Sequence, residues 1–125
     1  METKFFKCRH CGNVIVKMVD SGVAVKCCGE EMQELKPGTT DASTEKHVPV
    51  VTRIDDCTIH VEVGSTPHPM LPEHHIAFIY VVTEHGGRFV TLCDRPSADI
   101  CTCGDKVIAV LEYCNLHGLW KADGV

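Results

Sequence analysis

Four cysteines near the start of the chain are spaced as ligands of one metal ion. Cys8 and Cys11 form a C-x2-C pair, and the adjacent Cys27 and Cys28 supply the other half. The C-x2-C spacing lets two thiolates face one ion across a turn. Adjacent Cβ atoms of an extended chain point to opposite sides, so we expect the backbone to bend at the second pair. Four sulfur ligands suit iron or zinc, and the residues alone leave open whether the metal is redox-active or structural.

A second group of candidate ligands is rich in histidine. The chain has eight histidines, and the five in suggestive positions are His47, His68, His74, His75 and His117. Cys114 precedes His117 with a C-x2-H spacing that is compatible with a chelating turn. Taken singly, each histidine is more often a surface or hydrogen-bonded residue than a ligand. The residues therefore indicate a metal site and leave its membership open.

The elements that must hold the first group are short. In residues 1–36, two β-prone runs, Val14–Val19 and Val23–Lys26, flank Asp20-Ser21-Gly22, which predicts a hairpin. A segment of this length buries too little apolar surface to fold by itself, so a bound metal is expected to stabilise it. The polar, turn-rich residues 37–44 predict a linker.

Residues 45–125 show the pattern of a β-domain. Ile59, Val61 and Val63 alternate with polar residues, as in a half-buried strand, and residues 76–82 are apolar on both faces, as in a central strand. Three further β-prone runs cover residues 48–54, 88–92 and 106–113, with turn signals such as Gly86-Gly87 between runs. We predict an all-β protein: a small metal-bound domain followed by an immunoglobulin-like antiparallel β-sandwich.

Composition excludes several classes of function. The formal charge is -5 and the twelve basic residues form no cluster, which argues against nucleic acid as a partner. No stretch approaches the roughly twenty apolar residues that span a bilayer. The segment from Met1 to Phe6 has no long apolar run, so we expect no signal peptide. We expect a soluble protein of the cytoplasm, where cysteine pairs more often mean metal or redox chemistry than disulfides.

The ordered motifs resemble the desulfoferrodoxin family over nearly the whole chain. The C-x2-C pair with Cys27-Cys28-Gly29 is similar to a desulforedoxin domain, over residues 1–36. The rest, residues 45–125, is similar to a neelaredoxin domain. The matching stretches there are Glu45-Lys46-His47-Val48-Pro49-Val50, His68-Pro69-Met70 with His74, and Glu112-Tyr113-Cys114-Asn115-Leu116-His117-Gly118-Leu119-Trp120-Lys121.

The resemblance implies two iron sites per chain. The first is Fe(Cys)4, in which zinc could substitute for iron. The second is a catalytic Fe(His)4(Cys) centre whose ligands are His47, His68, His74, His117 and Cys114. The spacing from His68 selects His74 over His75. The resemblance also implies that Glu45 occupies the open position of the ferric iron and that Lys46 overhangs it.

The implied activity is that of a superoxide reductase, an oxidoreductase that converts superoxide to hydrogen peroxide by one-electron reduction and so detoxifies it. The family implies a small electron-donor protein such as rubredoxin and a homodimer. Two alternatives stay open. One is an electron-transport protein whose working site is the four-sulfur centre. The other is a zinc-binding interaction module in which both sites are structural.

Four further cysteines lie outside the family pattern: Cys57, Cys93, Cys101 and Cys103. Cys101-Thr102-Cys103 looks like a ligand pair, and two residues apart in a strand both side chains would share one face. We favour the interpretation that these are small thiols kept reduced in the cell. A redox or metal role for them is the minority hypothesis.

Overall fold

The computed structural model describes residues 3–39, 44–66, 68–92 and 94–123, with the side chains of Thr44 and Glu45 left out. The chain forms two compact units, Met1–Lys36 and Pro37–Val125. Both consist of antiparallel strands, and one four-residue helix, α1 (Thr44–His47), accompanies them. The all-β prediction is confirmed. Among the described residues, no helix is long and apolar enough to cross a membrane.

The first unit is built on a three-stranded sheet. Its central strand is β1 (Phe5–Lys7), flanked by β2 (Val14–Val16) and β5 (Gln33–Leu35). Two short paired strands, β3 (Lys26–Cys27) and β4 (Glu30–Glu31), hold the second half of the cysteine group: Cys27 ends β3 and Cys28 lies between the strands. The buried apolar side chains of this unit are few, which fits the expectation that it needs a metal to stabilise it.

The hairpin predicted between residues 14–19 and 23–26 is wrong. Strand β2 pairs instead with β1, which carries the buried Phe5. The turn between the two runs is present, since the Gly22 N–H donates to Asp20 Oδ1 at 2.8 Å and Gly22 has a φ of 87°. The chain therefore turns where glycine and aspartate dictate, without pairing the runs on either side.

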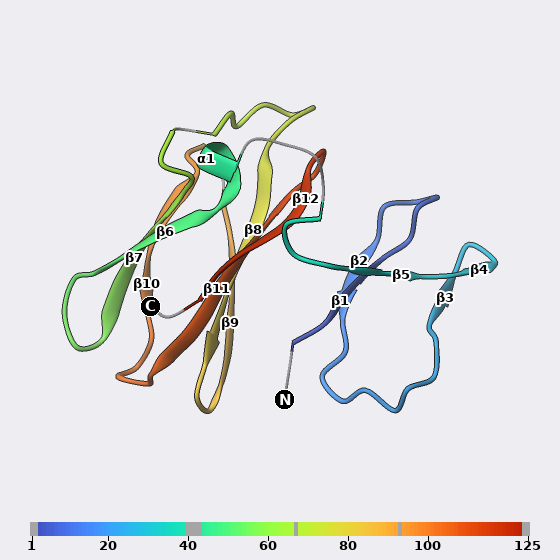
Figure 1. The fold of residues 1–125 in the computed structure, drawn as a ribbon, viewed down its shortest axis with the longest axis horizontal. Helices are drawn as coiled ribbons and strands as arrows, with labels where there is room; N and C mark the ends of the chain where they lie inside the picture. Colours follow the sequence, from blue (N-terminus) through green and yellow to red (C-terminus); the bar gives the residue numbers. More distant parts are fainter. Residues whose placement is uncertain (1–2, 40–43, 67, 93, 124–125) are drawn as a thin grey trace. The chain divides into compact units, whose positions relative to one another are not determined.

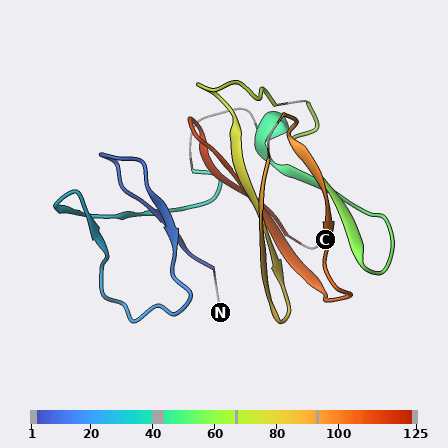
Figure 2. The same cartoon turned by 180° about the vertical axis from the view of Figure 1, so that it is seen from behind.

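The second unit is a sandwich of two antiparallel sheets (Figures 1 and 2). One sheet has the order β10-β7-β6 and the other the order β12-β11-β8-β9. The strands are β6 (Pro49–Arg53), β7 (Thr58–Val63), β8 (Ile76–Thr83), β9 (Gly86–Thr91), β10 (Ser97–Cys101), β11 (Val107–Cys114) and β12 (Gly118–Asp123). Seven strands divided three and four confirm the immunoglobulin-like sandwich.

The core lies between these two sheets. Ile59, Val61 and Val63 of β7 are fully buried, as their alternation with polar residues predicts. They pack against Ile79 and Val81 of β8 in the opposite sheet. The sequence does not predict strands β10 and β12, because neither contains an uninterrupted β-branched run.

The turn predicted at Gly86-Gly87 lies two residues earlier, at residues 84–85. Both glycines belong to β9, where Gly87 pairs with Val82. A Cβ atom on Gly87 would overlap the Tyr80 side chain, so glycine is there because an aromatic ring lies against the strand.

Three connections meet at one end of the sandwich (Figures 1 and 2). They are α1 before β6, the β7–β8 connection, and the turn between β11 and β12. In the part of the predicted linker that the structure describes, the Gly38 N–H donates to the Leu119 carbonyl at 2.9 Å. This end of the sandwich carries all the histidines of the second candidate group.

Candidate metal centres

The four cysteines of the first unit lie together. One sulfur atom from each of Cys8, Cys11, Cys27 and Cys28 is within 4.8 Å of the others. The Sγ atoms of Cys11 and Cys27 are 3.6 Å apart. The bend expected at the adjacent pair is present, with φ values of 54° at Cys28 and 75° at Gly29. This left-handed backbone turns two neighbouring side chains toward one point.

The thiols of this group compete for ionisation. The Cys11 backbone N–H lowers the pKa of Cys8 to about 6. Hydrogen bonds with the thiols of Cys11, Cys8 and Cys27 raise the pKa of Cys28 to about 12. Four thiolates at this spacing repel one another unless a cation lies between them. The donor set and its geometry therefore fit iron or zinc.

Four histidine rings of the second unit form a closed square. The order around it is His47, His68, His74 and His117. Neighbouring ring centroids are 4.8, 4.7, 5.0 and 4.9 Å apart, and the interplanar angles lie between 72° and 87°. Each ring thus presents its edge to the face of the next. Such an array directs one nitrogen of every ring toward a common centre.

The nitrogen atoms of this square fit a metal ion. His47 Nε2 lies 3.1 Å from His68 Nε2 and 3.1 Å from His117 Nδ1. A square with that edge has its centre about 2.2 Å from each corner, close to a metal–imidazole bond. Among the described residues, His74 Nε2 is buried and has no hydrogen-bond partner. A metal ion would satisfy this orphaned nitrogen, whereas protons alone cannot bridge all the corners.

Cys114 adds a sulfur to the four nitrogens. It is fully buried, and its Sγ is 3.9 Å from His117 Nδ1. All five candidate ligand atoms lie within 4.8 Å of one another. The pairing of β11 with β8 shifts register between Tyr113 and Cys114, because these neighbours pair with Phe78 and Ile76 and leave Ala77 of β8 as a bulge. Burial raises the pKa of the Cys114 thiol.

Glu112 lies two residues before this cysteine and is fully buried. Neither carboxyl oxygen of Glu112 has a hydrogen-bond partner among the described residues. Burial raises the pKa of Glu112 to about 9. The buried carboxyl group therefore favours its neutral form near pH 7, and its negative charge, once formed, raises the pKa of Cys114.

Burial favours the neutral form of two of the four histidines. Burial lowers the pKa of His68 to about 4 and lowers that of His74 as well. His68 donates its Nδ1–H to the Pro69 carbonyl at 2.7 Å, which leaves its Nε2 with a lone pair directed at the other rings. Neutral imidazoles with a fixed tautomer are the form that binds metal ions.

The remaining residues of interest lie beside this group. Lys46 lies in α1 and is exposed. The pKa of His74 is lowered mainly by burial, next by the charge of His117 and then by the positive charge of Lys46. The side chain of Glu45 lies outside the described residues. His75 is not part of the square, because its Nδ1–H donates to the Leu71 carbonyl at 3.0 Å. Of these two adjacent histidines, only His74 therefore belongs to the candidate metal site.

Asn115 is a residue whose contribution the sequence did not reveal. Its Oδ1 accepts a hydrogen bond from the His75 backbone N–H at 2.8 Å, and its Nδ2 donates to the Glu73 carbonyl at 3.0 Å. The two partners flank His74 on either side. Asn115 itself lies in the turn between Cys114 and His117, so one side chain ties the loop of one ligand to the turn of two others. The one feature of the sequence that points to Asn115 is its position inside the C-x2-H motif.

Trp120 supports the opposite side of the square. Its ring stacks on His47 with centroids 4.9 Å apart and an interplanar angle of 20°. Its Nε1–H donates to the His117 carbonyl at 3.0 Å. The tryptophan is buried, so it packs in the core and orients two candidate ligands at once.

Comparison with known proteins decides the family. The sequence profile of desulfoferrodoxin matches residues 39–123, more than half of the chain. The chain belongs to the desulfoferrodoxin family. It is 43% identical over 122 residues to the desulfoferrodoxin of Nitratidesulfovibrio vulgaris, covering 96% of this chain and 95% of that protein. It is 40% identical over 120 residues to a desulfoferrodoxin homologue of Archaeoglobus fulgidus, covering 94% of each.

A solved structure extends the likeness to both units. The crystal structure of the superoxide reductase from Treponema pallidum is 34% identical, with a TM-score of 0.81. The match covers 98% of this chain and 100% of that chain. Both metal-binding groups of this desulfoferrodoxin-family chain lie within the matched length.

Proposed function

We propose that this chain is a superoxide reductase that reduces superoxide to hydrogen peroxide at a mononuclear iron held by five side chains. The ligands we propose are His47, His68, His74, His117 and Cys114. The observation that carries the proposal is the square of four imidazoles with one buried sulfur beside it. Membership of the desulfoferrodoxin family and likeness to a solved superoxide reductase support the same activity.

Iron bound by this group would supply the single electron that superoxide requires. Imidazole binds a metal as the neutral ring, so the thiolate of Cys114 would be the one ligand with a negative charge. A thiolate ligand donates electron density to a metal, as the cysteine ligand of cytochromes P450 does. Cys114 is fully buried, while His74 and His117 are partly exposed, which leaves the solvent-facing side of the group for the substrate.

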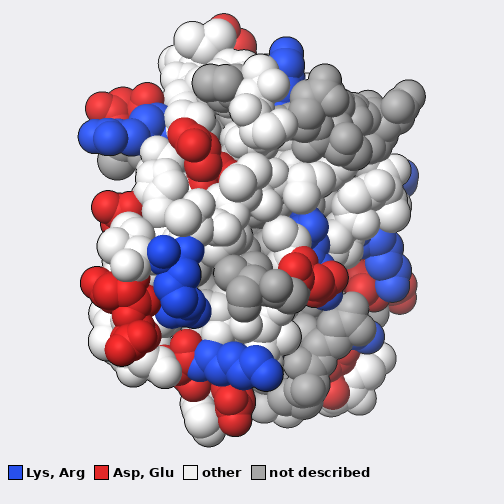
Figure 3. Space-filling model, turned by 60° about the vertical axis from the view of Figure 1, so that its left-hand side comes forward, with Lys and Arg blue, Asp and Glu red and all other residues white. Residues whose placement is uncertain are grey.

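Lys46 attracts the anionic substrate. The chain carries a net charge of -5, and on the face drawn in Figure 3 basic and acidic side chains are interspersed. The protein as a whole therefore does not attract an anion, and the attraction must be local. Lys46 lies next to His47 in sequence and is exposed. Its ammonium group also holds the water from which the forming peroxide takes protons.

Glu45 and the four-sulfur group complete the proposal. We assign Glu45 the role of a carboxylate that would bind the iron once the product has left. For the four-sulfur group we propose iron held by Cys8, Cys11, Cys27 and Cys28, with zinc as a substitute. Stabilisation of the short first unit supports a structural role for this metal.

The setting we propose is the cytoplasm, with a reduced protein such as rubredoxin as electron donor and a homodimer as the working form. All eight cysteines that the structure describes are free thiols, as a reducing compartment favours. Leu116, between Cys114 and His117, is 57% exposed and offers an apolar contact for the donor close to the ligands.

Product stoichiometry tests the proposed activity. Metal analysis first establishes two iron atoms per chain, after which the ferrous protein is mixed anaerobically with superoxide. A reductase forms one hydrogen peroxide for each superoxide consumed, oxidises one iron, and releases no dioxygen. Release of dioxygen would instead identify a dismutase, and colourless protein with zinc at both sites would identify a structural module.

A further inference from the structure

Three of the four cysteines outside the family pattern gather at the other end of the sandwich. Cys101 ends β10, Cys103 lies in the following turn, and Cys57 lies between β6 and β7. The Thr102 N–H donates to the Cys57 carbonyl at 2.6 Å and so holds these segments together. All three thiols are exposed. Cys93 lies outside the described residues.

This end is remote from the histidine square. Thr83, the last residue of β8, lines the cavity beside these cysteines, whereas His74 and His75 precede the first residue of the same strand. Eight residues of strand extend roughly 25 Å. The cysteine group therefore cannot contact the proposed iron ligands, and any chemistry it performs depends on a reactant that diffuses.

The turn that carries Cys103 has an unusual residue for its conformation. The Asp105 N–H donates to the Thr102 carbonyl at 2.9 Å, and the two central residues, Cys103 and Gly104, have φ values of 55° and 74°. Two positive φ values define a type I′ turn, whose first central position favours asparagine, aspartate or glycine. Turn propensity thus does not account for a cysteine there. The expectation that Cys101 and Cys103 lie together in a strand is wrong, because the strand ends at Cys101.

The two side chains nevertheless line one cavity. The Cys101 side chain raises the pKa of Cys103, first through hydrogen bonding and then through its charge, while Arg88 lowers it. Cys103 consequently favours its protonated form. Cys57 acts on Cys103 only through its charge, which is a weaker influence than that of Cys101. Cys103 therefore interacts more strongly with Cys101 than with Cys57.

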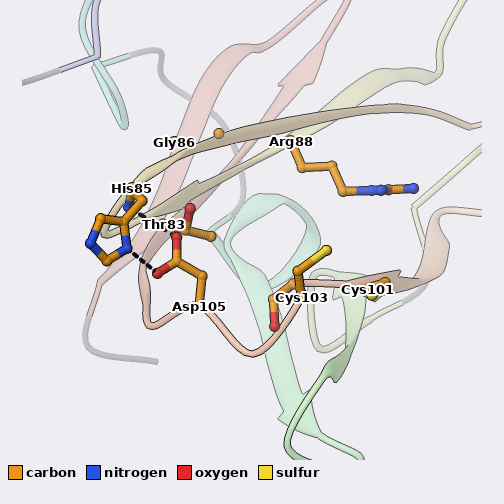
Figure 4. A pocket seen from close by; sticks show the side chains of 9 residues that line it. Thr83, His85, Gly86, Arg88, Cys101, Cys103 and Asp105 are labelled. Carbon is orange, nitrogen blue, oxygen red and sulfur yellow. Dashed lines mark hydrogen bonds and ion pairs between the residues drawn. The ribbon is translucent and has the colours of Figure 1, made fainter.

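A cavity of about 270 Å³ opens beside this pair. Figure 4 shows Arg88 of β9 extending along the side of the cavity where both cysteines lie, and His85 paired with Asp105 at the other side. The ion pair between His85 Nδ1 and Asp105 Oδ1 is 2.7 Å long and fastens the turn to the β8–β9 connection. A water molecule needs only about 30 Å³, so a small oxidant has free access to the sulfurs.

We propose that Cys101 and Cys103 form a dithiol that hydrogen peroxide oxidises to a disulfide. The proposal rests on the proposed function for its oxidant, because hydrogen peroxide is the product of superoxide reduction. The Cys101 sulfur attacks one peroxide oxygen, the O–O bond breaks, and Cys101 sulfenic acid and one water form. The Cys103 sulfur then attacks the sulfenic sulfur, an S–S bond forms, and a second water leaves with the Cys103 proton. Two thiols are oxidised and one peroxide is reduced to two waters.

The chain geometry permits this bond. Two residues apart along the chain, the Cα atoms are separated by at most about 7 Å. A disulfide needs Cα atoms about 4.4 to 6.8 Å apart. An exposed, short-loop disulfide is also readily reduced, so the pair can cycle with cellular thiols.

Peptide mapping of the full metal-loaded protein tests the proposal. The ferric protein receives a few equivalents of hydrogen peroxide, free thiols are alkylated, and the chain is cut before aspartate. The fragment Asp99–Gly104 contains only Cys101 and Cys103. We expect it to be lighter by two hydrogens, to resist alkylation, and to regain both thiols on reduction. We expect it to oxidise at least about tenfold faster than Cys57, the exposed thiol that serves as internal control.

Serine variants separate the two roles. In Cys103→Ser, peroxide should leave Cys101 as a sulfenic acid that dimedone traps, whereas in Cys101→Ser the remaining Cys103 should stay reduced. Cys57→Ser should form the same disulfide as the wild type. The proposal is overturned if the fragment stays fully alkylated, if it oxidises no faster than Cys57, or if the disulfide joins Cys57 to either residue.

A second arm replaces added peroxide with superoxide and a reductant for the iron. Oxidation of the fragment here, abolished by catalase, supports both the dithiol and its oxidant. Oxidation by added peroxide but not during superoxide turnover refutes the proposed function as the source of peroxide and leaves the dithiol chemistry standing. Failure with added peroxide refutes the dithiol whatever the superoxide result.

Discussion

The substitution Asn115→Ala isolates the contribution of one side chain to the proposed catalytic centre. It removes the hydrogen bonds to the His75 N–H and the Glu73 carbonyl, at 2.8 and 3.0 Å, on either side of His74. The backbone bond from the Asn115 N–H to the His75 carbonyl, at 3.2 Å, survives. The loop should therefore stay near its place while His74 gains freedom to leave the square.

The size of the expected stability loss depends on how exposed the two hydrogen bonds are to water. The bond to His75 is partly buried and the bond to Glu73 is exposed, where water can replace it. A net value of about 0.5–1.5 kcal/mol for each gives a loss of about 1–3 kcal/mol in the free energy of unfolding. Loss of a group that orients a metal ligand typically weakens metal affinity by about 10–100-fold.

Competition with a ferrous chelator at pH 7 measures this effect, with urea unfolding alongside. Asn115→Asp keeps the acceptor for His75 and loses the donor to Glu73, so its iron release should fall between those of the wild type and the alanine variant. Asn13→Ala is the matched control, since Asn13 Nδ2 contacts Cys27 Sγ at 3.6 Å in the other metal group. If Asn115→Ala released iron from the histidine site at the wild-type rate, the argument that this side chain orients His74 would be refuted.

Three further predictions concern stability. Removal of the metal from the four-sulfur group should abolish amide-exchange protection in β1 and leave protection in β8 intact, because only the short unit depends on that metal. Equal loss of protection in both strands would contradict this dependence. Ile79→Ala should lower the free energy of unfolding, measured with urea, by about 2–5 kcal/mol, while Ile108→Ala, at a 48% exposed position, should change it by less than about 1 kcal/mol. Similar losses in the two variants would contradict the assignment of Ile79 to the core. Asp105→Asn should lower the urea midpoint most between pH about 4 and 6.5. The difference should shrink as pH falls through 3.8 toward the folded pKa of Asp105 at about 2, and shrink again as pH rises beyond the raised pKa of His85; a difference independent of pH would show that their ion pair does not contribute.

Local patterns in the sequence predict the fold well where side chains alternate. The buried alternation of β7 is visible in the sequence because its polar neighbours face away from the core. The sequence predicts that β2 pairs with the next β-prone run along the chain. In the structure β2 pairs with β1, whose buried residue is Phe5. Partner choice depends on which side chain fills the small core, and a single β-prone run does not contain that information.

The metal groups were visible for a different reason. Cysteine and histidine are rare enough that their spacing carries information about a shared ion, and the family resemblance supplied the membership of the second group. The role of Asn115 could not be anticipated, because its two partners lie 40 and 42 positions earlier in the chain and are backbone groups. Cys103 was expected in a strand because residue type does not reveal a left-handed turn that lacks asparagine.

The choice between two adjacent histidines tests the central claim most directly. The decay of superoxide after pulse radiolysis is followed with the ferrous wild type, His74→Ala and His75→Ala at equal iron occupancy. His74 belongs to the square of imidazoles, whereas the His75 ring binds the Leu71 carbonyl. We predict that His75→Ala accelerates superoxide decay about as the wild type does and that His74→Ala loses at least about tenfold of that rate. Equal rates for the two variants, or decay no faster than without protein for the wild type, would contradict the assignment of this group as the site of superoxide reduction.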